Sequence, residues 1–254
     1  MGRSCRAATG CAALFVAIGG CGGTAAPSST PAFAGSYSSA HFVFQYTTLD
    51  AGNISTIAST VESQYPRIIA DLSAGAMPTV QVTLYLDHAA MVAATQAVAG
   101  FIPAFASGLV TAENQIHLMS PNAPAWGPFD RMVSNLVHEF AHCVSLHLNP
   151  RSANNPRWLW ESVAIYESGQ SVDLRTVGYM TALAPPSLES LNSFDNNRVY
   201  EVGYSIGEFV VSRWGQRGLR DLITRNGDTV AVLSLTPADF HRDWFAFARE
   251  RYGF

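Results

Sequence analysis

Residues 130–148 read DRMVSNLVHEFAHCVSLHL, and we expect the fold to be organised around this stretch. Its apolar positions recur at helical spacing, which predicts one amphipathic helix that begins near Phe129 and ends before Pro150. His138 and His142 are four residues apart, so both imidazoles project from the same face, about one turn from each other. Two imidazoles at this spacing can bind one metal ion.

The polar face of this predicted helix has an unusual composition. Its members are Ser134, Asn135, His138, Glu139, His142 and Ser145. The simplest interpretation is the solvated face of an ordinary amphipathic helix. However, the face has no arginine and only one acid. This composition favours the lining of a cleft over an exposed surface.

Two further residues of the helix are expected to have structural roles. His147 lies roughly opposite His138, so we expect it to cap the end of the helix and not to bind the metal. Cys143 falls on the apolar side, where it is expected to be a small buried hydrophobic residue. The other cysteines all lie within the first 21 residues, so Cys143 has no partner for an internal disulfide in the remaining chain.

Glu161 is the candidate third ligand, because a catalytic zinc ion usually takes three protein ligands and leaves one position open. It lies in a second predicted helix, which follows Pro156 and ends at Gly169. Its helical neighbours are apolar except for Arg157, so a cation would relieve the cost of burying its carboxylate. Glu167, turned away from Glu161 on the same helix, is the alternative ligand.

Length and composition limit the class of protein. The chain has 254 residues, which is enough for one domain together with targeting and linker segments. A hydrophobic content of 48% with 13% charged residues is typical of a globular chain. The net charge of -4 gives no indication of a nucleic-acid partner.

Residues 1–20 have the layout of a secretory signal, in which arginines precede an apolar run at residues 7–18 that is too short to span a bilayer. The run leads to Cys21 in a sequence that resembles the bacterial lipoprotein box, where the cysteine becomes lipidated. An ordinary signal peptide cut near Ala25 is the alternative. Residues 21–40 are rich in small residues and are expected to form a flexible linker. The sequence therefore predicts export, with an anchor in the membrane through a lipid on Cys21.

The folded domain is expected over residues 41–254. Strands are predicted at 41–46, 80–86, 108–112 and 115–119, and helices at 54–72, 89–98, 200–214 and after Pro237. The last two strands meet at Glu113 and Asn114, which we interpret as a hairpin turn. The expected fold class is α+β, with a small mixed sheet packed on the central helix and a mostly helical C-terminal part. An edge strand beside the metal site could pair with an extended peptide.

The motifs resemble those of the gluzincin zinc peptidases. His138 and His142 are followed by 18 residues and then Glu161, which is similar to the ligand spacing of that group. Residues 158–164, WLWESVA, resemble the WLxEGFA segment of the aminopeptidase N family, with Ser162 in place of the usual glycine. The flanking strands, the long helix and the C-terminal tail are similar to small bacterial peptidase-MA-like domains.

The resemblance implies a single gluzincin-like (thermolysin-like) catalytic domain that binds one Zn²⁺ ion. His138, His142 and Glu161 would be its ligands. Glu139 would deprotonate a water molecule at the zinc and pass the proton to the leaving amine. Tyr200 matches the tyrosine that hydrogen-bonds the developing oxyanion in the family. A core tyrosine on the predicted helix is the alternative role for Tyr200.

The implied function is hydrolysis of peptide bonds in a peptide or protein substrate outside the cytoplasm. One alternative is a non-catalytic surface lipoprotein that uses the same fold as a binding module. Another is a zinc amidase that acts on cell-wall material. Residues 112–114, Ala-Glu-Asn, are similar to the element with which aminopeptidases bind a free amino terminus. Because this element is one residue short and lies at a predicted turn, exopeptidase activity is not predicted.

Overall fold

The structure is a computed structural model that describes residues 33–254. The predicted signal segment, residues 1–20, and the predicted lipidation site Cys21 lie outside the described residues, so both stay predictions. Within the described part of the chain, none of the helices combines the length and the apolar character that a membrane-spanning segment needs.

The described residues form a sheet together with helices, which confirms the predicted α+β class. The strands are β1 (Gly35–Ser38), β2 (Phe42–Tyr46), β3 (Val80–Tyr85), β4 (Gly108–Ala112) and β5 (Gln115–Met119). The longer helices are α1 (Ile54–Asp71), α2 (His88–Ala99), α3 (Phe129–Leu148), α4 (Arg157–Ser168), α7 (Val199–Thr224) and α9 (Pro237–Tyr252). The short elements are α5 (Gly178–Thr181), α6 (Leu188–Leu191), α8 (Thr229–Leu233) and the 3₁₀ turns η1 (Pro124–Trp126) and η2 (Leu174–Thr176). α7 extends past the predicted end at residue 214 and is kinked at Gly215, whose φ is 67°.

β1 lies within residues 21–40, the segment predicted as a linker. The strand pairs antiparallel with β2 along its length, and Tyr37 packs against the hydrophobic core. The small residues of this segment resemble a linker in composition, but pairing with β2 fixes them as an edge strand. The folded domain therefore extends further toward the N-terminus than the predicted start at His41.

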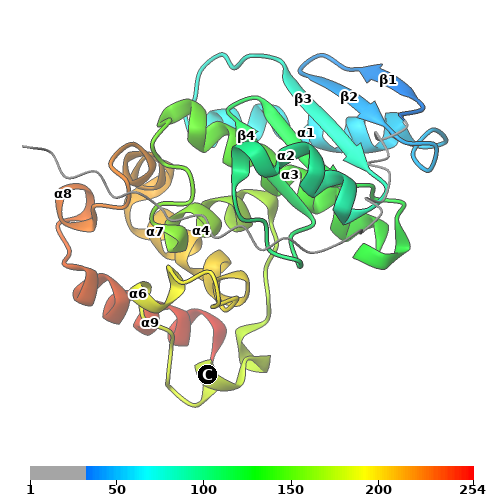
Figure 1. The fold of residues 1–254 in the computed structure, drawn as a ribbon. Helices are drawn as coiled ribbons and strands as arrows, with labels where there is room; N and C mark the ends of the chain where they lie inside the picture. Colours follow the sequence, from blue (N-terminus) through cyan, green and yellow to red (C-terminus); the bar gives the residue numbers. More distant parts are fainter. Residues whose placement is uncertain (1–32) are drawn as a thin grey trace, which may run out of the picture. The chain divides into compact units, whose positions relative to one another are not determined.

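The sheet is mixed and has the strand order β1-β2-β3-β5-β4 (Figure 1). β3 pairs in parallel with β2 and with β5, whereas β1 and β4 are antiparallel strands at the two edges. β4 and β5 are joined by the predicted turn at Glu113 and Asn114. The hairpin brings an edge strand, β4, into contact with α3.

α3 is held against the sheet by aromatic packing. The ring centroid of Phe140 lies 5.2 Å from that of Phe42 in β2 and 5.3 Å from that of Tyr65 in α1. All three rings are buried. Because Phe140 occupies the sheet side of α3, His138 and His142 are directed toward α4.

Two glycines let α7 pack closely on α4. A Cβ atom at Gly203 would lie 2.8 Å from Cδ1 of Ile165, and one at Gly207 would lie 2.6 Å from Cβ of Tyr166. Real Cβ atoms essentially never approach other heavy atoms within 3.0 Å. The two glycines therefore permit the contact that brings the start of α7 beside α4.

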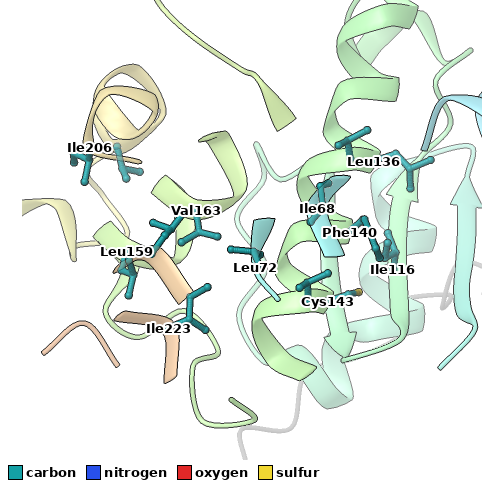
Figure 2. Close-up of a cluster of buried hydrophobic side chains, with 14 of the residues drawn as sticks. Ile68, Leu72, Ile116, Leu136, Phe140, Cys143, Leu159, Val163, Ile206 and Ile223 are labelled. Carbon is teal, nitrogen blue, oxygen red and sulfur yellow. The ribbon is translucent and has the colours of Figure 1, made fainter. Parts of the chain in front are cut away.

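Figure 2 shows part of the buried core that joins the sheet to the C-terminal helices. Phe140 and Cys143 of α3 belong to the same hydrophobic cluster as Leu159 and Val163 of α4. Cys143 is fully buried and forms no disulfide, as predicted for a small core residue. α3 and α4, which carry the predicted ligands, are thus fixed by packing on their apolar sides.

Glu167, the alternative third ligand, joins α4 to α1. Nη1 of Arg67 lies 2.8 Å from Oε2 of Glu167, and the same guanidinium donates to the backbone carbonyl of Glu167. The Glu167 side chain is buried, and its Oε1 atom has no hydrogen-bond partner among the described residues. Burial raises the pKa of Glu167 to about 7, although Arg67 lowers it. Glu167 is therefore a structural carboxylate and not part of the ligand cluster.

Ionisation of Glu167 is expected to make the free energy of unfolding depend on pH. Its pKa rises from the ordinary 4.5 to about 7 on folding, so folding favours the protonated form. The ionised carboxylate therefore lowers the free energy of unfolding. This loss is absent below about pH 4.5, grows between pH 4.5 and 7, and is constant above pH 7. Relative to Glu167→Gln, the wild type should lose up to about 3 kcal/mol across this window. Urea unfolding from pH 5 to 8 measures the difference, with the exposed Glu250→Gln as control. A wild-type-to-variant difference that is the same at every pH would contradict the prediction.

Candidate metal centre

α3 and α4 bring the three predicted ligands, His138, His142 and Glu161, together. One potential ligand atom from each residue lies within 4.8 Å of the other two. Oε2 of Glu161 lies 3.3 Å from Nε2 of His138 and 3.8 Å from Nε2 of His142. Tetrahedral zinc has bonds to nitrogen and oxygen of about 2.0–2.2 Å, which places its ligand atoms roughly 3.4 Å apart. The spacing therefore fits one small cation.

The hydrogen bonding of Glu161 also fits a cation. Its carboxylate is buried, and Oε2 has no hydrogen-bond donor among the described residues, although it faces two imidazole nitrogens. The buried guanidinium of Arg157 lies nearer the other oxygen, with Nε 4.0 Å from Oε1, and also donates to carbonyl oxygens of the loop after α6. A buried carboxylate oxygen without a donor is costly. A metal ion at this point would remove the cost, so the residues present fit a zinc ligand set.

The charges of the cluster perturb the pKa values of its members. Burial lowers the pKa of His138, but the Glu161 and Glu139 carboxylates outweigh it, so this pKa is raised. Burial and the neighbouring His138 hold the pKa of His142 well below 6.5, which keeps this imidazole neutral. The nearby carboxylates thus favour the protonated form of His138, and Nε2 of this imidazole lies 3.3 Å from Oε2 of Glu161. A cation bound between these atoms would compete with that proton.

The two histidines are oriented by different contacts. Nδ1 of His138 lies 3.0 Å from Oε1 of Gln170, the residue that follows the C-terminal glycine of α4. The ring of His142 instead stacks on Trp160, with centroids 4.1 Å apart and an interplanar angle of 6°. Nδ1 of His142 has no hydrogen-bond partner within residues 33–254. Sequence reasoning missed both contacts, since no spacing pattern connects Gln170 to His138.

Glu139 lies beside the beginning of β4. A Cβ atom on Gly108 would lie 2.8 Å from Oε1 of Glu139, so the absence of a side chain at Gly108 leaves room for the carboxylate. Burial raises the pKa of Glu139 to about 7. Glu139 does not belong to the cluster of potential ligands, which consists of His138, His142 and Glu161. The site therefore combines three converging ligands with a separate carboxylate at an edge strand.

Tyr200, at the start of α7, reaches the same centre. Its hydroxyl donates to Oε1 of Glu161 at 3.2 Å, and its ring lies 5.4 Å from the guanidinium carbon of Arg157. The residue is 37% exposed, so the alternative of a core tyrosine is wrong. Burial of the hydroxyl and the Glu161 charge raise the pKa of Tyr200 well above its ordinary value. The phenol is therefore a hydrogen-bond donor at neutral pH.

The five other histidines are not part of the ligand cluster, and the sequence suggests a role for one of them, His147. His147 is in the last turn of α3, where a capping residue was expected, but its Nδ1 lies 2.7 Å from Oε2 of Glu113 in the β4–β5 turn. His88, the first residue of α2, binds the carbonyl of Pro103 and stacks on Trp126. Neither residue contributes a ligand.

Comparison of the chain with protein-family models, with curated proteins and with solved structures finds no match. The interpretation of the centre therefore depends on its own geometry, and the likeness to gluzincins stays a prediction.

Zinc should bind at this centre and stabilise the fold. At a free zinc concentration about 100 times Kd, binding to the folded state alone adds about 2.7 kcal/mol to the free energy of unfolding. Glu161→Gln removes the anionic ligand and should abolish most of this gain, whereas Glu167→Gln on the same helix should keep it. Thermal unfolding of chelator-treated protein, with and without zinc, measures both effects. If zinc raises the unfolding temperature of wild type and of Glu161→Gln equally, the metal binds elsewhere.

Proposed function

We propose that this protein is an exported zinc-dependent peptidase. The observation that supports the proposal most strongly is the combination of the His138, His142 and Glu161 cluster with the unliganded Glu139 carboxylate at an open sheet edge. Structural metal sites are usually closed by four protein ligands, whereas catalytic sites keep one position open. The described residues supply three converging ligands, which favours the catalytic kind.

Each residue near the cluster has a chemical role in this proposal. A zinc ion held by His138, His142 and Glu161 would supply Lewis-acid chemistry, polarising the scissile carbonyl and lowering the pKa of a water molecule. Glu139, one residue after the first ligand, accepts the proton of the attacking water and returns it to the leaving amine.

β4 is the element suited to hold a peptide. It is an edge strand of the described sheet, so one side of its backbone is available for hydrogen bonds to an extended chain. Its first residue, Gly108, lies against the Glu139 carboxylate. A peptide paired with β4 would therefore bring its own backbone past Glu139. This arrangement favours an extended peptide as substrate.

Tyr200 is suited to stabilise the carbonyl oxygen that gains negative charge during attack. Its phenol stays protonated at neutral pH and already lies next to a ligand, 3.2 Å from Oε1 of Glu161. A donor aimed at the developing charge lowers the barrier to hydrolysis. In this role the hydroxyl breaks its hydrogen bond to Glu161 and donates a hydrogen bond to the substrate oxygen instead.

Glu139→Gln should retain zinc and lose cleavage. The amide cannot accept the proton of water, so kcat should fall by roughly 10²- to 10⁴-fold. Glu113→Gln, in the β4–β5 turn, serves as the matched control and should cleave normally, because Glu113 binds only His147 in the described structure. The measurement is cleavage of a mixed peptide library by each zinc-loaded protein, with zinc content determined in parallel. If the zinc-loaded wild type cleaves no peptide but hydrolyses members of a panel of cell-wall amides, the amidase alternative is favoured. If it hydrolyses neither kind of substrate, the protein is better explained as a non-catalytic binding module.

Tyr200→Phe distinguishes an oxyanion donor from a residue that only holds Glu161. As an oxyanion donor, Tyr200 should contribute roughly 10²-fold to kcat, with little change in KM or in zinc affinity. Tyr204→Phe, one turn further along α7, is the control. Steady-state kinetics and zinc competition with a chelator provide the readouts. A loss of zinc affinity at unchanged kcat would assign Tyr200 to ligand positioning alone.

A further inference from the structure

Behind the metal ligand His138 lies a continuous chain of hydrogen bonds. Oε1 of Gln170 lies 3.0 Å from Nδ1 of His138. Nε2 of Gln170 donates to Oδ1 of Asn135 at 2.7 Å, and Nδ2 of Asn135 donates to Oγ of Ser107 at 2.9 Å. The chain therefore runs from the metal ligand to the residue that precedes β4.

The orientations of the two amides in this structure give the tautomer of His138. Amide nitrogens only donate hydrogen bonds and amide oxygens only accept them. Because Nε2 of Gln170 is used on Asn135, the oxygen of Gln170 is the atom that faces His138. With this orientation Nδ1 of His138 is the donor to Gln170, and in the neutral imidazole Nε2 is then free to bind a metal. Nε2 is also the atom that lies 3.3 Å from Oε2 of Glu161.

Three separate segments of the fold contribute to this chain. Gln170 follows Gly169, whose left-handed backbone (φ 71°) ends α4, and the backbone N–H of Gln170 donates to Ile165. Asn135 lies on α3, three residues before His138 and hence on the same helix face. Ser107 is fixed to the sheet, because its backbone carbonyl accepts a hydrogen bond from Met119 of β5.

The second histidine has no such support. Nδ1 of His142 lacks a hydrogen-bond partner in the described residues, and Trp160 orients the ring by stacking. The polar chain is therefore specific to His138.

We propose that Gln170 and Asn135 are positioning residues that hold His138 in its metal-binding tautomer and couple this ligand to the start of β4 through Ser107. The inference rests on the proposed zinc centre but not on peptide cleavage. Hydrogen bonds of this kind to a ligand imidazole raise its basicity and fix its ring, and their loss typically costs 10- to 100-fold in metal affinity.

The test compares zinc affinity among Gln170 variants by competition with a chelator. Gln170→Leu removes the acceptor and should weaken zinc binding 10- to 100-fold. Gln170→Glu keeps an oxygen for Nδ1–H, and the amide of Asn135 can turn to donate to the other carboxylate oxygen, so the affinity should return to near the wild-type value. The exposed Gln96→Leu on α2 is the control for a glutamine-to-leucine change that does not touch the centre.

A spectroscopic readout separates positioning from general stability. In zinc-loaded wild type, imidazole ¹⁵N–¹H correlation should show His138 protonated at Nδ1 and protected from exchange with water, and Gln170→Leu should lose that protection. If Gln170→Leu does not fold, Asn135→Ala provides the second variant. This variant removes the acceptor that holds the Gln170 side chain. It should therefore weaken zinc binding and reduce the protection of Nδ1–H, as Gln170→Leu does.

The outcomes distinguish this inference from the proposed function. Zinc affinity within about twofold of wild type in Gln170→Leu, or a Gln170→Glu variant as weak as Gln170→Leu, overturns the positioning role even if the enzyme cleaves peptides. The expected affinity pattern in a protein that cleaves no peptide supports the positioning role and contradicts the peptidase. A wild type that binds no zinc overturns both.

Discussion

The burial of the Glu161 carboxylate between α3 and α4 is the constraint on which the rest of the centre depends. A buried carboxylate is stable only when charges or donors surround both oxygens. One oxygen receives the Tyr200 hydroxyl and lies near Arg157, whereas the other faces only the imidazole nitrogens of His138 and His142. The helices are thus arranged around a point that one proton or one cation must occupy.

Apolar packing provides the rigidity that this point requires. Phe140 fixes α3 between the sheet and α1, while Gly203 and Gly207 allow α7 to approach α4 closely enough for Tyr200 to reach Glu161. The polar chain through Gln170 and Asn135 then joins α3 to Ser107, the residue before the edge strand β4. Core packing and polar contacts therefore position the same few side chains from opposite sides.

The sequence predicted what depends on local spacing. The helix of His138 and His142 has the expected bounds, because its apolar period and the following proline are local signals. Glu161 could be proposed from ligand spacing and from its apolar neighbours. β1 could not be predicted, because its small residues resemble a linker and only its pairing with β2 identifies it as a strand. Gln170 was equally inaccessible, because the hydrogen bond to His138 exists only after α3 and α4 have packed.

The most direct test of the account is a crystal structure of zinc-loaded protein with anomalous diffraction at the zinc edge. The account predicts one zinc ion bound by Nε2 of His138, Nε2 of His142 and a carboxylate oxygen of Glu161, at about 2.0–2.2 Å from each. Zinc farther than about 2.5 Å from the Glu161 carboxylate, or bound through Nδ1 of His138, would contradict it.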